Sequence, residues 1–394
     1  MRNGFIYLLS ASHAVADLSP GALPAVLPFF ALHYGLSYTE IAGLVFASSC
    51  LSSAVQPVFG LMADKTNQSW FMGLGVLLTG ISLGLTGWIS DYWLIFAAIV
   101  VMGTGSSIFH PQAARYVNFI SGAKKSTGIG MFSVGGNAGF GLGPLLAVWV
   151  IGIWGLKGVG IFALLSLLFG TALLAMGPKL EREAAALHKA ENTKLHKSDS
   201  DAKNDWKSFC RLTLVIIGRS VVFCSISAFL PLYCISKFGI TEAVAGTTLS
   251  VFAFGCTIMT LVGGWLGDRI GLIQTLRLGS LVLIPSVAGI CVCPSIGWMF
   301  ALLLIISFGI NVTYPSFVVL GQTYLAKNVG FASGITLGLS FSVGGMVVPV
   351  LGKVADIYSL DTVMVILIAL SAFCAAGAFL LKEKAGERKA PRKN

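Results

Sequence analysis

Charged residues are scarce in this sequence of 394 residues, where Asp, Glu, Lys and Arg together make up 11% of the chain. A soluble globular protein carries about a quarter of such residues. Hydrophobic residues make up 56% of the chain, and apolar surface in that excess needs lipid as its solvent. The scarcity of charge therefore excludes a soluble protein and predicts one that is embedded in a membrane.

Long apolar runs take the place of the missing charges. A transmembrane helix needs about 20 predominantly apolar residues, and twelve such runs follow one another along the chain. We therefore predict an all-α, polytopic membrane protein with twelve transmembrane helices. The predicted spans are 5–32, 40–62, 70–90, 93–117, 126–152, 156–177, 209–236, 242–266, 272–293, 296–323, 330–354 and 361–381.

The few basic residues are distributed unevenly between the loops. Of the 26 Lys and Arg residues, 21 lie in or next to the termini and one set of alternating loops. Basic residues are retained on the cytoplasmic side during insertion, so this bias predicts a multi-pass protein of the inner (plasma) membrane with both termini in the cytoplasm. The net charge of +10 is thus a topology signal, and we expect contact with membrane lipid but not with nucleic acid.

The sequence shows no pattern of paired cysteines or metal ligands. Most of the eight cysteines lie inside apolar spans, and Cys291 and Cys293 lack a second pair. An enzyme is expected to direct a nucleophile with its base, paired carboxylates or metal ligands at one cavity. We find none of these in the sequence, so we predict no cofactor, no metal site and no enzymatic activity.

A charged segment divides the chain into two parts. We predict an N-terminal six-helix bundle at 1–177, a cytoplasmic linker at 178–207, a C-terminal six-helix bundle at 208–382 and a basic cytoplasmic tail at 383–394. Within the linker we expect a helix over Glu181–Lys189.

The two parts repeat each other at a shift near 204 residues. Leu27-Pro28 recurs as Leu230-Pro231, Gly35 as Gly239, Pro111 as Pro315, and Ser133-Val-Gly-Gly136 as Ser342-Val-Gly-Gly345. Parallel halves that are related about the membrane normal let one half rock against the other around a central site. The repeat therefore predicts two pseudo-symmetric bundles and favours a transporter.

One repeated motif, Gly-x-x-x-Asp followed by a base, comes after the second and the eighth span. Its members are Gly60, Asp64 and Lys65 in the first half, and Gly264, Asp268 and Arg269 in the second. The glycine permits close helix contact, and the acid can cap a neighbouring helix N-terminus or pair with a base there. We expect the acids and bases to act in gating. The motif resembles the loop signature of the major facilitator superfamily, which implies that family's transporter fold.

A run of small residues in the fifth span, Gly135-Gly-Asn-Ala-Gly139-Phe-Gly-Leu-Gly143-Pro144, forms a smooth helix face. The superfamily's antiporters carry a similar Gly-Pro ending at this place. Gly143 and Pro144 are therefore candidates for gating, and plain helix packing is the alternative.

Carboxylates are almost absent from the spans. Asp17 is the only one deep inside a predicted helix, and a rise of ~1.5 Å per residue places it about 18 Å from the cytoplasmic end. A charge in the hydrocarbon region costs roughly 2.5–3.5 kcal/mol, which makes Asp17 a functional candidate. His13 shares its helix face at the i, i+4 spacing. We expect both residues to couple transport to protons.

Arg219 is expected at a similar depth in the seventh span, because the repeat relates it to a position near 15. An acid and a base that face one cavity can form a gate or a proton switch, in which protonation of Asp17 frees Arg219 for an anion. A static buried pair is the alternative, although such pairs stabilise a core poorly.

Polar residues of the fourth and tenth spans complete the candidate site. His110 either relays protons or caps backbone carbonyls near Pro111, and Arg115 either contacts substrate or extends to the membrane surface. Asn137 of the fifth span, with Asn311 and Tyr314 of the tenth, are further candidates for substrate contact.

Three of these motifs carry a narrower resemblance. His13-x-x-x-Asp17, the segment from Gly103 to Arg115, and the segment from Ser133 to Pro144 together resemble the fosmidomycin-resistance group of the superfamily. The resemblance implies proton-driven export of a small anionic phosphonate antibiotic. In this interpretation the partners are protons and an anionic small molecule, and we expect a monomer.

Two other functions are compatible with the same residues. Proton-coupled uptake of an organic anion would use the same acid and bases, and only the partial motif of the fifth span favours antiport. A membrane receptor on this scaffold is a less favoured alternative.

Overall fold

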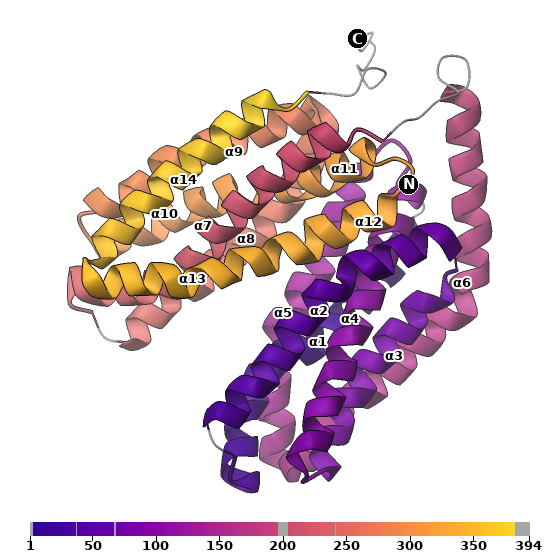
Figure 1. The fold of residues 1–394 in the computed structure, drawn as a ribbon, viewed down its shortest axis with the longest axis horizontal. Helices are drawn as coiled ribbons and strands as arrows, with labels where there is room; N and C mark the ends of the chain where they lie inside the picture. The colour runs from indigo at the N-terminus through magenta and orange to yellow at the C-terminus, as the bar shows by residue number, and fades with distance from the viewer. Residues whose placement is uncertain (1–2, 37, 67, 196–203, 241, 383–394) are drawn as a thin grey trace. The chain divides into compact units, whose positions relative to one another are not determined.

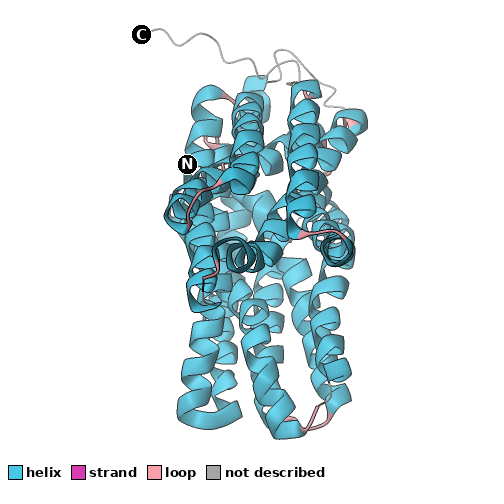
Figure 2. Cartoon of the chain, turned by 90° about the vertical axis from the view of Figure 1, so that its left-hand side faces the viewer, coloured by secondary structure: helices cyan, strands magenta, loops and turns pink. Residues whose placement is uncertain are grey.

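The computed structural model describes residues 3–36, 38–66, 68–195, 204–240 and 242–382. These residues are almost entirely helical, and no strand occurs among them (Figure 2). By contact pattern the chain forms two units, one from residues 1–202 and 328–342 and the other from 203–327 and 343–394.

The first unit contains six long helices and the beginning of a seventh (Figure 1). Its elements are α1 (Asn3–Tyr34), α2 (Tyr38–Thr66), α3 (Trp70–Leu85) with a 3-10 turn (Thr86–Trp88), α4 (Tyr92–Ile120), α5 (Lys125–Trp154) with a second 3-10 turn (Gly155–Val159), α6 (Gly160–Leu195), and α12 (Val329–Ser333) with a π-helical turn (Gly334–Leu339). Helix α1 packs on α5, α3 packs on α4 and α6, and α12 packs on α2.

The second unit is built from the remaining helices. They are α7 (Trp206–Phe238), α8 (Glu242–Ile270), α9 (Leu272–Val292), α10 (Ile296–Asn311), α11 (Tyr314–Tyr324), α13 (Ser340–Ile357) and α14 (Leu360–Leu380). Helices α7 and α9 pack on α14, and α8 and α9 pack on α10. Their common core consists of hydrophobic side chains that are mostly aliphatic, among them Val222, Ile226, Val287, Leu303, Ile306 and Leu367.

Large apolar side chains are exposed on the surface of both units. Trp93, Leu145 and Phe254 expose 69%, 68% and 67% of their areas, which a water-soluble surface would not tolerate over so many helices. Nine helical stretches among the described residues are long and apolar enough to cross a membrane. One of them, Lys125–Leu187, has 63 residues and contains α5 and most of α6. Each of the twelve predicted spans falls on a helical segment of the structure. The predicted all-α fold is confirmed.

Helix α6 is longer than the sequence pattern indicated. It continues through Pro178 to Leu195, where we predicted a linker with a helix only over Glu181–Lys189. The extension is rich in Ala, Leu, Glu and Lys, which are good helix formers. Leu180 and Ala184 are buried, and the Glu181 carboxylate accepts a hydrogen bond from the Ser69 N–H at the start of α3. Packing and capping therefore hold the extension in place, while 196–203 lie outside the described residues.

Candidate functional site

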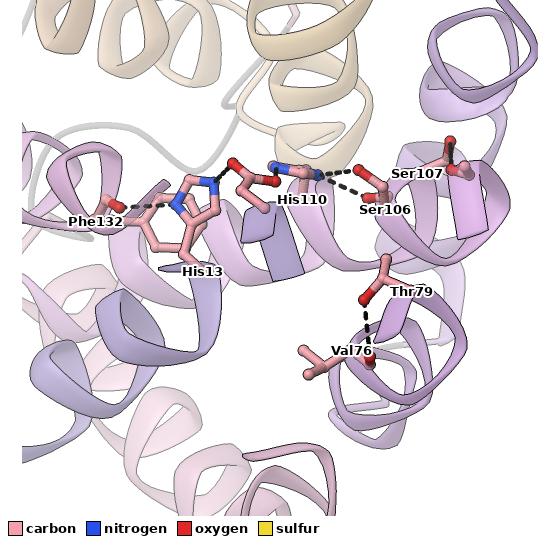
Figure 3. A network of polar contacts seen from close by, with 9 residues as sticks. His13, Val76, Thr79, Ser106, Ser107, His110 and Phe132 are labelled. Carbon is pink, nitrogen blue, oxygen red and sulfur yellow. Dashed lines mark hydrogen bonds and ion pairs between the residues drawn. The ribbon is translucent and has the colours of Figure 1, made fainter. Parts of the chain in front are cut away.

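The clearest cluster of ionisable groups lies in the first unit, where α1 meets α4 and α5. His13 Nε2 lies 3.1 Å from Asp17 Oδ2, and His110 Nε2 lies 3.1 Å from Asp17 Oδ1. One carboxylate thus faces two imidazoles, which Figure 3 shows directed toward each other from α1 and α4. We call these three residues the His-Asp-His triad. The predicted placement of His13 and Asp17 on one helix face is confirmed.

Main-chain carbonyls fix the orientation of both imidazoles. His13 Nδ1 lies 2.7 Å from the carbonyl oxygen of Phe132 in α5, and His110 Nδ1 lies 2.7 Å from that of Ser106 in its own helix (Figure 3). A carbonyl oxygen can only accept, so each Nδ1 must carry the hydrogen. The Nε2 atoms are therefore the ones available to the carboxylate. The Phe132 ring stacks on His13 with centroids 4.0 Å apart, which further limits rotation of that imidazole.

His110 uses both of its ring nitrogens in contacts. Its Nδ1 contacts a carbonyl in the turn before Pro111, and its Nε2 contacts the carboxylate. The triad is only partly buried, since the side chains of Asp17, His110 and His13 expose 15%, 13% and 8% of their areas. The groups are thus shielded from bulk solvent but remain within reach of small ions.

A glycine makes room for the triad, and sequence reasoning gave it no such role. A Cβ atom on Gly136 of α5 would lie 2.5 Å from His13 Nε2 and 2.8 Å from Asp17 Oδ2. Any larger residue would therefore collide with these two side chains of α1. The signal in the sequence was the repeated Ser-Val-Gly-Gly motif, in which Gly136 is the last residue.

The glycines of α5 bring the helix into backbone contact with α1. Gly135, Gly139 and Gly143 face the main chain of α1 at Ser10, Ala14 and Leu18, each time one turn further along. Cβ atoms at these glycines would collide with the opposing carbonyl groups. The packing role of the small-residue face is thus confirmed. Pro144 lies inside α5, which continues through it to Trp154.

The motif after the second span forms a cap on another helix of the same unit. Asp64 Oδ1 accepts a hydrogen bond from the Gly330 N–H at 2.7 Å, and Oδ2 accepts one from the Phe331 N–H at 3.0 Å. Arg115 Nε lies 3.5 Å from Asp64 Oδ1, and the Arg115 guanidinium also lies over the Phe119 ring. Asp64 therefore makes both contacts expected of it, because it caps a helix start and pairs with a base.

Arg115 is accordingly placed beside Asp64 and not at the triad. It lies only five residues beyond His110 in the sequence, but its partner is on a different helix. The residue is buried, with 9% of its area exposed. Sequence reasoning offered either substrate contact or extension to the membrane surface, and it missed this partner because Asp64 belongs to a different helix. Asn137 and Lys65 have exposed side chains.

The second unit holds a separate cationic cluster around Arg219 of α7. Arg219 Nε donates to the Ile310 carbonyl at 2.9 Å, and Nη2 donates to Asn311 Oδ1 at 3.3 Å. The guanidinium lies 5.3 Å from the centroid of the Tyr314 ring. Three predicted substrate residues are thus brought together where α10 ends and α11 begins. The helix break exposes the Ile310 carbonyl, and Arg219 satisfies it.

Donors remain available in this cluster. Asn311 is 7% exposed, and its Nδ2 has no hydrogen-bond partner within the described part of the chain. A buried amide donor without a partner costs roughly 1–3 kcal/mol, which a bound acceptor would recover.

Of the second repeated motif, Asp268 is half-buried, and Arg269 lies 4.8 Å from the centroid of the Trp265 ring.

Comparison with known proteins identifies the family to which this fold belongs. The family model described as Major Facilitator Superfamily matches residues 9–349. The chain belongs to this superfamily. Members of this family are transporters, so the chain is a multi-pass membrane transporter and not an enzyme.

Individual members of the superfamily resemble the chain over most of its length. It is 29% identical over 363 residues to the fosmidomycin resistance protein of Escherichia coli K12, covering 91% of this chain and 88% of that protein. It is 22% identical over 350 residues to a probable nitrate transporter, NarT, of Staphylococcus aureus MRSA252, with 88% and 87% covered. The resemblance inferred from the motifs is thereby confirmed at the level of sequence similarity.

Solved structures from the superfamily share the fold. The crystal structure of FucP, a superfamily transporter in the outward conformation, aligns with a TM-score of 0.73 at 16% identity, covering 96% of this chain and 99% of FucP. At this identity the likeness concerns the fold alone.

Proposed function

We propose that this transporter is a proton-coupled antiporter that exports small anionic compounds, such as phosphonates of the fosmidomycin type, across the inner membrane. The His-Asp-His triad is the observation that carries the proposal. Carboxylate and imidazole groups within membrane helices mark proton pathways, and here one carboxylate lies 3.1 Å from each of two imidazoles. The relative named for fosmidomycin resistance supports the choice of cargo.

The proposed proton site consists of Asp17, His13 and His110. Because both Nδ1 atoms are held by carbonyls, a proton that enters the triad must lie on an Nε2 atom or on the carboxylate. Loss of a proton from one Nε2–carboxylate contact leaves two lone pairs facing each other, so that contact opens. Proton release would thereby loosen the link between α1 and α4, and this is the movement we assign to the coupling step.

The proposed anion site consists of Arg219 with Asn311 and Tyr314. A guanidinium presents several donors in one plane and suits the oxygens of phosphonates and carboxylates. The unpaired Nδ2 of Asn311 adds a donor beside it.

Asp64 and Arg115 are assigned to gating, because their contacts tie α2 and α4 to the start of α12. The excess of basic residues in alternating loops supports cytoplasmic termini.

Proton flux in everted vesicles that are acid inside tests the proposal. Adding fosmidomycin should draw protons out of vesicles that contain the unaltered transporter, and the Asp17→Asn variant should show no such flux. Asp91→Asn is the matched control, because Asp91 is an exposed carboxylate that caps α4 by accepting from the Leu94 N–H, and an Asn oxygen can do the same. This control should behave as the unaltered protein does.

Proton-coupled uptake of an anion is the second candidate, favoured by the similarity to probable nitrate transporters. If fosmidomycin moves no protons through the unaltered protein, antiport of this drug is wrong. The same vesicles should then be tested with nitrate and a panel of carboxylates. In uptake, the added anion and the protons would move in the same direction.

A further inference from the structure

We propose that the His-Asp-His triad is also a binding site for a divalent transition-metal ion of the zinc type. The ligands would be His13 Nε2, His110 Nε2 and a carboxylate oxygen of Asp17. Sequence reasoning predicted no metal site, because the three residues come from two helices and share no ligand spacing along the chain. The fold brings them to one point.

The separation of the ligand atoms suits a bound metal ion. Each Nε2 lies 3.1 Å from a carboxylate oxygen, and the three ligand atoms all lie within 4.8 Å of one another. Zinc binds imidazole nitrogen and carboxylate oxygen at about 2.0–2.2 Å in tetrahedral geometry, so its ligand atoms lie roughly 3.3–3.5 Å apart. An ion can therefore replace the direct contacts with small side-chain movements.

Both imidazoles are also held in place through their second ring nitrogen. Metal-bound histidines almost always donate their other ring N–H to a carbonyl or carboxylate, which fixes the ring and its tautomer. His13 and His110 both do so, each to a main-chain carbonyl at 2.7 Å. Because these carbonyls belong to helices α5 and α4, the Nε2 atoms are directed toward Asp17 before any ion arrives.

The donor set determines the class of ion. Two imidazoles with one carboxylate suit Zn²⁺, Co²⁺, Ni²⁺ or Fe²⁺, whereas Mg²⁺ and Ca²⁺ prefer sites made entirely of oxygen atoms. Three protein ligands leave a fourth position for water or another small ligand. The partial exposure of Asp17 and His110, at 15% and 13% of their side chains, leaves room on that side.

Gly136 keeps space open against the same atoms. A methyl group at this position would lie 2.5 Å from His13 Nε2 and 2.8 Å from Asp17 Oδ2, which is where the ion would have to approach. Binding of the metal requires no transport, so it can be tested apart from the proposed function. The consequence that zinc blocks proton coupling, by occupying the same three atoms, does rest on that function.

The experiment is a titration of the full-length protein, purified in detergent without a polyhistidine tag, with ZnSO₄ by calorimetry and with CoCl₂ by absorption. Seven described cysteines, all in the second unit, are free thiols and are competing ligands. Cobalt separates the two cases, because thiolate ligands give an intense near-ultraviolet charge-transfer band and a His-Asp-His site gives only ligand-field bands. We expect one ion per chain without the charge-transfer band.

Three variants locate the ion. Asp17→Asn and His110→Gln should each weaken binding by at least about tenfold, since even changes behind the ligands cost 10–100-fold. His33→Gln is the matched control, because His33 lies on the same helix and is exposed, and its binding should equal that of the unaltered protein. Gly136→Ala keeps every ligand and should also weaken binding, which separates loss of the site from misfolding of a ligand variant.

Two outcomes would overturn the inference. One is equal zinc affinity in the unaltered protein and in both ligand variants, and the other is the absence of saturable binding. A cobalt spectrum dominated by thiolate bands would assign the ion to cysteines and would likewise reject the triad as its site.

Discussion

The contact between α1 and α5 depends on the absence of a side chain at Gly139, and the Gly139→Ala variant tests this. A Cβ atom there would lie 2.7 Å from the carbonyl carbon and 2.8 Å from the Cα atom of Ala14, and closer still to the Ala14 oxygen. Carbon atoms in contact are normally about 3.5–4.0 Å apart. The two helices would therefore have to separate by roughly 1 Å at this point, and no flexible side chain can absorb the change.

The expected cost follows from that geometry. Inserting a methyl group into packed backbone costs about 1–3 kcal/mol. In a domain of this size each kcal/mol shifts the unfolding midpoint by ~2–4 °C, so Gly139→Ala should lower it by roughly 6 °C. Gly141→Ala is the control, because it lies on the same helix with no atom within 4 Å of its Cβ. Both variants gain the same helix propensity from alanine, so their difference isolates packing.

The assay heats detergent-purified protein and measures by size-exclusion chromatography the fraction that stays monodisperse. Gly141→Ala should unfold at or slightly above the temperature of the unaltered protein, and Gly139→Ala should unfold well below it. If both variants unfold at the same temperature, the close approach of α1 and α5 is not what stabilises the first unit, and the argument from these glycines fails.

Three further substitutions test other contacts. Asp64→Asn turns one acceptor into a donor that faces the Gly330 or Phe331 N–H, so we expect a loss of about 1–3 kcal/mol of stability with slower transport. Lys65 is exposed, so Lys65→Gln should leave the melting temperature unchanged. In Arg219→Lys, the ammonium cannot donate to the Ile310 carbonyl and to Asn311 in one plane, so substrate binding measured by calorimetry should weaken at least about tenfold. Arg269 is exposed, so the Arg269→Lys variant should bind substrate as the unaltered protein does. Lys237→Met leaves the Ile290 and Cys291 carbonyls at the end of α9 without their donor, and the unfolding midpoint should fall by several degrees while Lys157→Met does not change it.

The sequence was sufficient wherever the relevant contact is local. The i, i+4 spacing of His13 and Asp17 predicted that they share a helix face, because a helix alone places them there. The apolar runs predicted the helices, because each must span a bilayer of fixed thickness. Gly35 and Gly239, at matching positions of the repeat, have φ values of 66° and 62°, a conformation that favours glycine.

Contacts between helices could not be predicted in the same way. His110 meets Asp17, and Arg115 meets Asp64, only because α4 packs between other helices of the first unit. Helical periodicity gives the face of each residue but not the partner that this face meets. The end of α6 was placed too early for a local reason. The charged composition after Pro178 indicated a solvated linker, but the same residues are good helix formers and continue the helix. Whether Asp17 exchanges contacts with Arg219 during transport stays a prediction, since each has its partners within its own unit.

The carbonyl anchors of the two imidazoles also have an electrical consequence. In the proposed coupling cycle, with both Nδ1 hydrogens donated to carbonyls, one proton lies in each Nε2–carboxylate contact. The loaded triad then carries one net positive charge, which the release of one of these protons removes. If the proposed antiport moves one such proton inward for each monoanion that leaves, every cycle transfers two elementary charges across the membrane. A potential of 100 mV then supplies roughly 4.6 kcal/mol per cycle, so the membrane voltage alone sustains about a two-thousandfold gradient of the exported anion, even without a difference in pH.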